Sequence, residues 1–165
     1  MNRYLPQSAA TGALTVAAVA FATIAGAWIF QYLGFPPCDL CYEQRYAYYV
    51  GVPLAALAFA LAKAGAPRTI VVASLIALAL IFAANAILAG YHSGVEAGLW
   101  PGPTACTGSI ADQPKGNLLE QLQTIKVVRC DAVSLRVFGL SLANWNILIS
   151  AALAALAARA IFSSR

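Results

Sequence analysis

The sequence predicts an all-α membrane protein, built as a four-transmembrane-helix bundle in one domain over residues 1–165. Composition is the first observation behind this prediction, because hydrophobic residues make up 61% of the chain and charged residues only 10%. Soluble domains contain roughly 25% charged residues, so this chain lacks the charge to cover a water-facing surface. The second observation is that the few charged residues separate four long apolar stretches.

Each apolar stretch is long enough to cross a bilayer, which takes about 20 residues with a range of roughly 17–25. The first stretch is also longer than the roughly 7–15 apolar residues of a signal peptide, so we interpret it as a span. Helices are expected, because backbone polar groups in lipid must be paired within their own segment. The predicted spans are 10–33, 46–62, 69–90 and 139–160, and the predicted outer loops are 34–45 and 91–138.

Charge distribution predicts the orientation of the bundle. The side with both termini has five basic residues and no acidic residue, in short segments next to helix ends. The other side has five basic and all six acidic residues, mostly along the loop 91–138. The positive-inside rule therefore places both termini inside.

The net charge of the chain is +4, but its basic residues form no cluster, so nucleic acid is not expected as a partner. Aromatic residues on the outer side fit an interfacial belt: Tyr32, Tyr42, Tyr46, Tyr48, Tyr49, Tyr91 and Trp100.

All four cysteines fall in the outer loops, Cys38 and Cys41 in the first and Cys106 and Cys130 in the second. Cysteines confined to the oxidising face of a membrane indicate disulfide chemistry. We expect no metal site, because zinc would need a second close pair or well-placed histidines, and the chain has one histidine. Purely structural disulfides that brace the loops remain an alternative.

The stretch FPPCDLCYEQR (35–45) favours a reactive role for the first pair. A helix is expected to begin near Pro36 or Pro37, which puts Cys38 and Cys41 one turn apart. A disulfide between them would contribute only about 2 kcal/mol, against about 3.5 kcal/mol for one between Cys106 and Cys130. A helix N-terminus and a nearby cation both stabilise a thiolate, which is the reactive species.

Arg45 and His92 are the candidate ligand-binding residues beside this pair. Arg45 follows Cys41 by four residues, so the two can share a helix face, and its guanidinium can bind an electron-rich or anionic ligand. The alternative is that Arg45 anchors the helix at the membrane interface. His92 lies at the outer end of the third span and can reach the same level, although it can equally be an ordinary interfacial residue. We interpret Asn144, Trp145 and Asn146 as helix-packing residues.

The second outer loop has two parts. GLWPGPTACTG (98–108) is rich in glycine and proline, which predicts irregular structure around Cys106. GNLLEQLQTIKVVRC (116–130) has an apolar stripe at helical spacing and predicts a short amphipathic helix. That helix can lie flat in the outer membrane interface or pack on the other helices.

The pattern of four spans, P-C-x-x-C-x-x-x-R in the first outer loop and two separated cysteines in the second resembles the DsbB family of bacterial inner membranes. This resemblance implies a multi-pass inner-membrane protein surrounded by lipid, with periplasmic loops and cytoplasmic termini. It implies that a Cys106–Cys130 disulfide oxidises a soluble, DsbA-like thioredoxin-fold partner, with Cys106 in the mixed disulfide and Cys130 resolving it. Electrons would pass to Cys38 and Cys41, and Cys41 would deliver them to a quinone, ubiquinone rather than menaquinone. Arg45 matches the family arginine that assists the quinone, and a quinone role for His92 is a weaker expectation.

Two rivals to this interpretation stay open. One is a vitamin K epoxide reductase-like thiol enzyme, in which the quinone-facing CxxC follows the loop pair, whereas here CDLC comes first. The other is a membrane scaffold whose disulfides only brace its loops.

Overall fold

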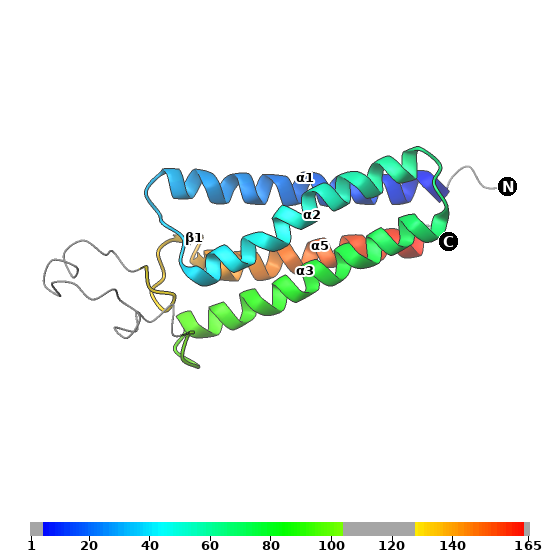
Figure 1. Ribbon diagram of the computed structural model, residues 1–165. Helices are drawn as coiled ribbons and strands as arrows, with labels where there is room; N and C mark the ends of the chain where they lie inside the picture. Colours follow the sequence, from blue (N-terminus) through cyan, green and yellow to red (C-terminus); the bar gives the residue numbers. More distant parts are fainter. Residues whose placement is uncertain (1–4, 104–127, 164–165) are drawn as a thin grey trace, which may run out of the picture.

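The computed structural model describes residues 5–103 and 128–163 of the chain. Its described part has four helices long and apolar enough to cross a membrane, which confirms the predicted all-α membrane fold. The elements are α1 (Leu5–Tyr32), α2 (Asp39–Lys63), α3 (Arg68–Glu96), β1 (Arg136–Val137), β2 (Leu140–Ser141) and α5 (Leu142–Ser163). The helices run alongside one another, with the start of α1 and the end of α5 at the same end of the bundle (Figure 1).

Each helix packs on two neighbours, α1 and α3 each contacting both α2 and α5. The core between them is rich in buried alanine, and a Cβ on Gly12 would lie only 2.6 Å from the Cβ of Ala160. Small residues let membrane helices approach closely, because van der Waals packing between backbones replaces the hydrophobic effect in lipid. The alanine-rich sequence therefore favours a tight bundle over a loose set of spans.

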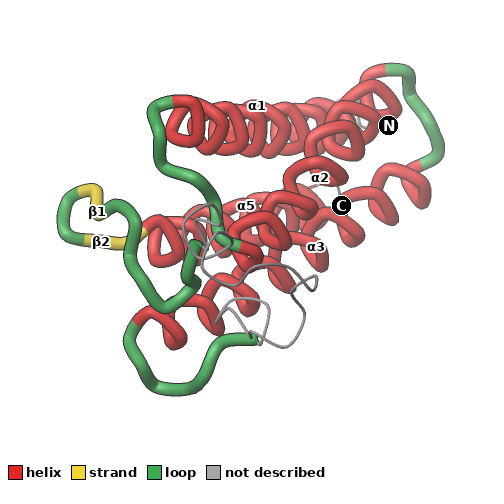
Figure 2. The backbone as a smooth tube through the Cα atoms, turned by 60° about the vertical axis from the view of Figure 1, so that its left-hand side comes forward, coloured by secondary structure: helices red, strands yellow, loops and turns green. Residues whose placement is uncertain are grey.

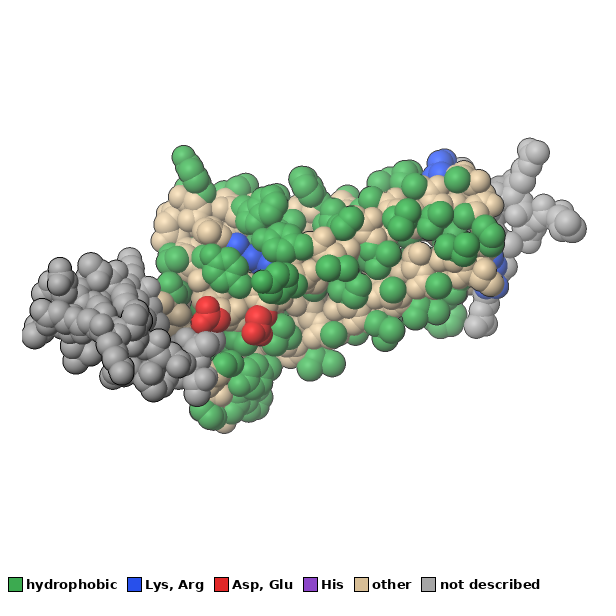
Figure 3. Space-filling model, viewed as in Figure 1, with side chains coloured by type: hydrophobic (Ala, Val, Ile, Leu, Met, Phe, Trp, Pro, Cys, Tyr) green, Lys and Arg blue, Asp and Glu red, His purple; other side chains and the backbone are tan. Residues whose placement is uncertain are grey.

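The outer surface of the bundle is strongly apolar. Hydrophobic side chains cover the middle of the face drawn in Figure 3, and charged side chains lie toward its two ends. Leu80 is 65% exposed and Ile87 is 75% exposed, as lipid-facing side chains should be.

The helix ends differ from the predicted span boundaries. Helix α2 begins at Asp39, just after the proline pair where its start was expected but seven residues before the predicted span 46–62, and α3 continues to Glu96, six residues beyond the predicted end at 90. Both differences have one cause: charged residues mark the edge of the apolar stretch, but a helix can continue past that edge into the interface. As a result, Cys41 and Arg45 lie on one helix, as their spacing predicts, and His92 lies on α3 and not in the predicted loop 91–138.

Helix α5 begins at Leu142 instead of residue 139, because a small hairpin precedes it. Strands β1 and β2 pair antiparallel, Arg136 with Ser141 and Val137 with Leu140. The two residues between them, Phe138 and Gly139, have φ angles of 51° and 83°. Positive φ at both positions is typical of the type I′ turn that joins two-residue hairpins. Figure 2 shows this hairpin next to the start of α5, away from the C-terminus.

Two further predictions concern the amphipathic helix 116–130, which the structure tests only in part, and Tyr48, for which the prediction was wrong. Most of the predicted amphipathic helix, 116–127, lies outside the described residues, and residues 128–130 are not helical. Tyr48 is not part of an interfacial belt, because it is 3% exposed and lies in the core of the bundle. Tyr32, Tyr42, Tyr46 and Tyr49 are exposed as the belt requires.

Candidate dithiol site

Cys38 forms the N-cap of α2 at the end of the bundle where α1 and α3 finish, which we call the dithiol end. Its backbone is extended, with φ −79° and ψ 172°, and its sulfur accepts a hydrogen bond from the backbone N–H of Cys41 at 3.3 Å. A sulfur therefore occupies the position that Ser or Asp takes in ordinary caps. The partial positive charge of the helix N-terminus favours a thiolate there.

Burial and the second thiol act in the opposite direction on Cys38. Its side chain is 5% exposed, and the hydrogen bond with the Cys41 side chain, followed by desolvation, raises the pKa of the Cys38 thiol above its ordinary value. The hydrogen bond to His92 lowers this pKa, but by less. Cys38 is thus a protonated thiol at neutral pH. Both Cys38 and Cys41 are free thiols in the structure.

His92 reaches the dithiol from α3. Its Nε2 atom lies 3.6 Å from the Cys38 sulfur and 3.9 Å from Oε1 of Glu96. Its Nδ1 atom lies 2.8 Å from Nε2 of Gln44, one turn beyond Cys41 on α2. His92 is 3% exposed, so it is an interior residue in contact with the Cys38 thiol rather than a surface polar residue.

A chain of buried polar side chains continues from His92 into the bundle. Asn146 of α5 donates to Oε1 of Gln44 and accepts from the Tyr48 hydroxyl, both at 2.5 Å. Tyr48 also lies 3.1 Å from the hydroxyl of Ser150, which accepts from Asn85 at 2.9 Å. Polar groups inside a membrane are costly unless paired, and this chain pairs them across α2, α3 and α5.

Arg45 is buried at 8% exposure, which does not fit a simple interfacial anchor. It donates to Oε1 of Gln31 at 2.6 Å and to the carbonyl of Ala27 at 3.2 Å, so it ties α2 to α1. Its guanidinium also lies 5.4 Å from the centre of the Tyr42 ring, within the range of a cation–π contact.

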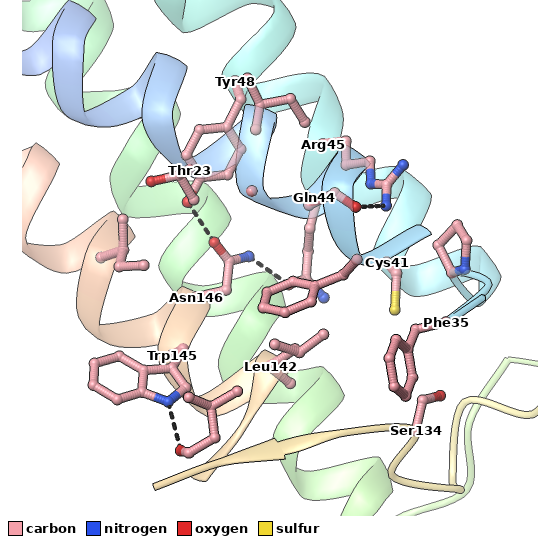
Figure 4. Close-up of a pocket in the computed structure, with 18 of the residues that line it drawn as sticks. Thr23, Phe35, Cys41, Gln44, Arg45, Tyr48, Ser134, Leu142, Trp145 and Asn146 are labelled. Carbon is pink, nitrogen blue, oxygen red and sulfur yellow. Dashed lines mark hydrogen bonds between the residues drawn. The ribbon is translucent and has the colours of Figure 1, made fainter. Parts of the chain in front are cut away.

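A cavity of about 330 Å³ opens beside these residues, between α1, α2 and α5. Cys41, Gln44 and Arg45 project toward it from α2, while Leu142, Trp145 and Asn146 project from the start of α5 (Figure 4). His92 is also in its wall, whereas Cys38 is not. The two thiols therefore face different surroundings, Cys41 the cavity and Cys38 the protein interior.

Cys130 lies close to Cys38 on its interior side. It is 1% exposed and belongs to a small apolar cluster with Cys38, Leu40 and Val95. Cys130 is disulfide-bonded. The fold thus places a disulfide sulfur from the second loop in the same buried cluster as the first CxxC thiol. Cys106 lies outside the described residues.

Of the predicted site residues, the structure brings together Cys38, Cys41, Arg45, His92 and Cys130 at the dithiol end. Sequence reasoning missed Gln44, and it assigned Asn146 to packing. The available signal was polarity inside an apolar span, which marks a site in membrane proteins. Packing does describe Asn144, which accepts a hydrogen bond from Ser93 at 2.6 Å.

Fold and site together define a multi-pass membrane protein with a redox-capable dithiol beside an apolar cavity. Residues 9–160 match the family described as "DsbB: Disulfide bond formation protein DsbB". The chain belongs to this family, which implies disulfide-forming oxidoreductase activity, a general link to quinones and DsbA-like partners. It is also 24% identical over 142 residues to "Uncharacterized protein RP370" of Rickettsia prowazekii (strain Madrid E), covering 83% of this chain and 77% of that protein. No solved structure matches the chain.

Proposed function

We propose that this protein oxidises a soluble, DsbA-like dithiol protein outside the membrane and passes the electrons to a quinone inside it. The observation that supports this most directly is the division between the two thiols. Cys41 is in the wall of the cavity with Arg45, while Cys38 is buried beside the disulfide-bonded Cys130. In this arrangement Cys38 can exchange with the disulfide of the second loop, while Cys41 can pass electrons to an acceptor bound in the cavity.

The cavity suits the head of a quinone, a flat and mostly apolar ring with two carbonyl acceptors. Its volume of about 330 Å³ is within the range of small-molecule pockets, roughly 300–1,000 Å³. Its wall is largely apolar, with donors at Arg45, Gln44 and Asn146. A guanidinium has five N–H donors, so Arg45 can hold α1 and bind a carbonyl oxygen at the same time.

In the proposed reaction the partner dithiol reduces a Cys106–Cys130 disulfide by thiol–disulfide exchange and becomes a disulfide itself. The resulting dithiol then reduces a Cys38–Cys41 disulfide in the same way, and no electrons are lost in either exchange. A bound quinone supplies the final oxidant, since it accepts two electrons and two protons for each dithiol oxidised. Cys41 faces this acceptor, Arg45 orients it, and His92 contacts Cys38 through the ring nitrogen that can exchange a proton.

We also propose the bacterial inner membrane as the location, with both termini in the cytoplasm and the dithiol end at the periplasmic face. The support is the charge asymmetry, since the opposite end of the bundle has Lys63 and Arg68 at adjoining helix ends. Ubiquinone is the substrate to test before menaquinone.

The experiment that tests the proposed function is quinone reduction by the purified protein in detergent, followed by absorbance, with a reduced thioredoxin-fold dithiol protein as donor. Turnover with ubiquinone that disappears in Cys41→Ser supports the proposal. A folded wild-type protein that reduces neither ubiquinone nor menaquinone with any such donor would overturn it in favour of structural disulfides.

A further inference from the structure

Three atoms of the kinds that bind zinc, two sulfurs and an imidazole nitrogen, meet at the dithiol end. The sulfurs of Cys38 and Cys41 and a ring nitrogen of His92 all lie within 4.8 Å of one another. From the sequence we expected no metal site, because the chain has one histidine and it lies 54 residues from Cys38. In the fold, this histidine lies next to both cysteines, so the reason for that expectation no longer holds.

The spacing of these atoms is close to that of a tetrahedral metal site. With zinc–sulfur bonds of about 2.3 Å and zinc–nitrogen bonds of about 2.0 Å, neighbouring ligand atoms stand roughly 3.5 Å apart. The Cys38 sulfur and His92 Nε2 are already 3.6 Å apart. The Cys41 thiol is half-buried on the first turn of α2, so a rotation of its side chain can close the remaining gap.

The surroundings of His92 can support a metal-binding tautomer. Metal binding at Nε2 moves the ring proton to Nδ1, which then needs an acceptor, and Gln44 provides one if its amide reverses. The hydrogen bonds of Asn146 and Tyr48 can reverse direction at the same time, because each side chain has both a donor and an acceptor. The Tyr48 hydroxyl would then donate to Ser150, which already lies 3.1 Å away. The hydrogen bonds from His92 through Gln44 and Asn146 to Tyr48 can therefore form in either direction, although reversal costs the bond that Ser150 donates to Asn146 Oδ1 at 3.2 Å.

Two different ligands could occupy the fourth position of the metal. Cys41 and His92 both belong to the cavity wall, so an ion held by them would be open to the cavity on one side. The carboxylate of Glu96 is the second source, since its Oε1 lies 3.9 Å from the same His92 nitrogen. Three protein ligands with one open position match the Cys₂His type of zinc site.

We propose that the reduced Cys38–Cys41 dithiol and His92 form a binding site for a thiophilic divalent cation such as Zn²⁺. Binding replaces two thiol protons by one divalent ion, so two protons are released and the net charge of the site does not change. Formation of the Cys38–Cys41 disulfide removes both sulfur ligands, so only the reduced protein binds. The ion would hold the pair reduced and prevent its oxidation, which makes the site inhibitory. This inference goes beyond the proposed function and needs no quinone to be tested.

The test uses Co²⁺ as a spectroscopic substitute for Zn²⁺, titrated anaerobically into the reduced full-length protein in detergent. We expect one Co²⁺ per chain, with thiolate-to-cobalt absorption that Zn²⁺ abolishes and that the oxidised protein does not show. Cys38→Ser and Cys41→Ser should each remove the absorption, and Cys106→Ser should keep it. His92→Gln keeps a hydrogen-bonding group but is a poor ligand, and should weaken Co²⁺ binding about tenfold or more.

Equal Co²⁺ affinity in His92→Gln and wild type would overturn the proposal, because any dithiol would then suffice. Loss of the absorption in Cys106→Ser, or its retention in Cys38→Ser, would also overturn it by placing the ion on the other pair. Circular dichroism of each variant shows whether it is folded, and alkylation protection by Zn²⁺ at Cys41 in the wild type gives a second readout. Protection that is absent in the reduced wild type contradicts the site without any variant.

Discussion

His92 Nε2 lies 3.6 Å from the sulfur of Cys38, and both side chains are almost fully buried. This contact joins the last turns of α3 to the N-cap of α2, and with the cavity on the other side it separates the environments of the two thiols. Cys38 is enclosed by protein, whereas Cys41 faces a space that a small molecule can enter. The reactivities of two thiols only three residues apart should therefore differ widely.

Alkylation of the reduced protein should modify Cys41 well before Cys38 at neutral pH. Burial limits access to Cys38, and its raised pKa keeps it a thiol, whereas only the thiolate reacts. Because the pKa is raised, the reaction at Cys38 should accelerate as the pH increases through the alkaline range. Iodoacetamide labelling of separate peptides by mass spectrometry measures both rates. Similar rates in the folded protein, as expected after denaturation, would contradict this separation.

Replacement of Arg45 by alanine should raise the KM for quinone much more than it lowers kcat. Loss of a charge-assisted hydrogen bond costs about 1.5–3 kcal/mol, or roughly 10- to 100-fold in affinity. Arg45→Lys is the matched variant, because it keeps the charge but cannot bind Gln31, Ala27 and a ligand with one planar group. It should fall between alanine and wild type. An unchanged KM in Arg45→Ala, with quinone limiting, would remove Arg45 from the quinone site and leave it only as the tie between α1 and α2.

Much of this arrangement follows from the sequence, because composition and charge spacing are enough to predict four spans. The spacing of Cys38, Cys41 and Arg45 on one helix is local and equally readable. The contacts of His92, Gln44 and Asn146 are not, since they join three helices and depend on how the helices rotate against one another. The alanine-rich faces give little information about that rotation. The hairpin before α5 was also missed, because a two-residue strand has too few positions to show alternation.

Tyr48→Phe should destabilise the bundle, although it removes only one oxygen atom. The Tyr48 hydroxyl donates to Asn146 and lies beside Ser150, so its loss leaves buried polar groups with fewer partners. Hydrogen bonds between membrane helices contribute about 0.6 kcal/mol on average and up to about 1.7 kcal/mol. The matched control is Tyr46→Phe, two residues away on the same helix but 65% exposed. Unfolding midpoints in detergent should fall for Tyr48→Phe alone, and an equal fall in both variants would contradict the role of the buried chain.

Gly94→Ala should slow oxidation of a protein partner more than oxidation of a small dithiol such as dithiothreitol. Trp100 folds back on α3, stacking on Tyr91 and donating to its carbonyl at 2.9 Å. A Cβ on Gly94 would lie 2.0 Å from the Trp100 ring, so the indole has to leave. Trp100 begins the segment that leads to Cys106, and its displacement should alter how that segment meets a large partner while leaving the cavity intact.

Gly90→Ala is the control for this substitution, because it lies one turn earlier on α3 and an added Cβ there meets nothing within 4 Å. It makes the same change in helix propensity without touching Trp100, so its two rates should keep the wild-type ratio. The ratio of the two oxidation rates, measured on both variants with one quinone, is independent of protein concentration and of any partial loss of activity. A ratio in Gly94→Ala equal to that in Gly90→Ala would mean that the position of Trp100 does not affect partner recognition.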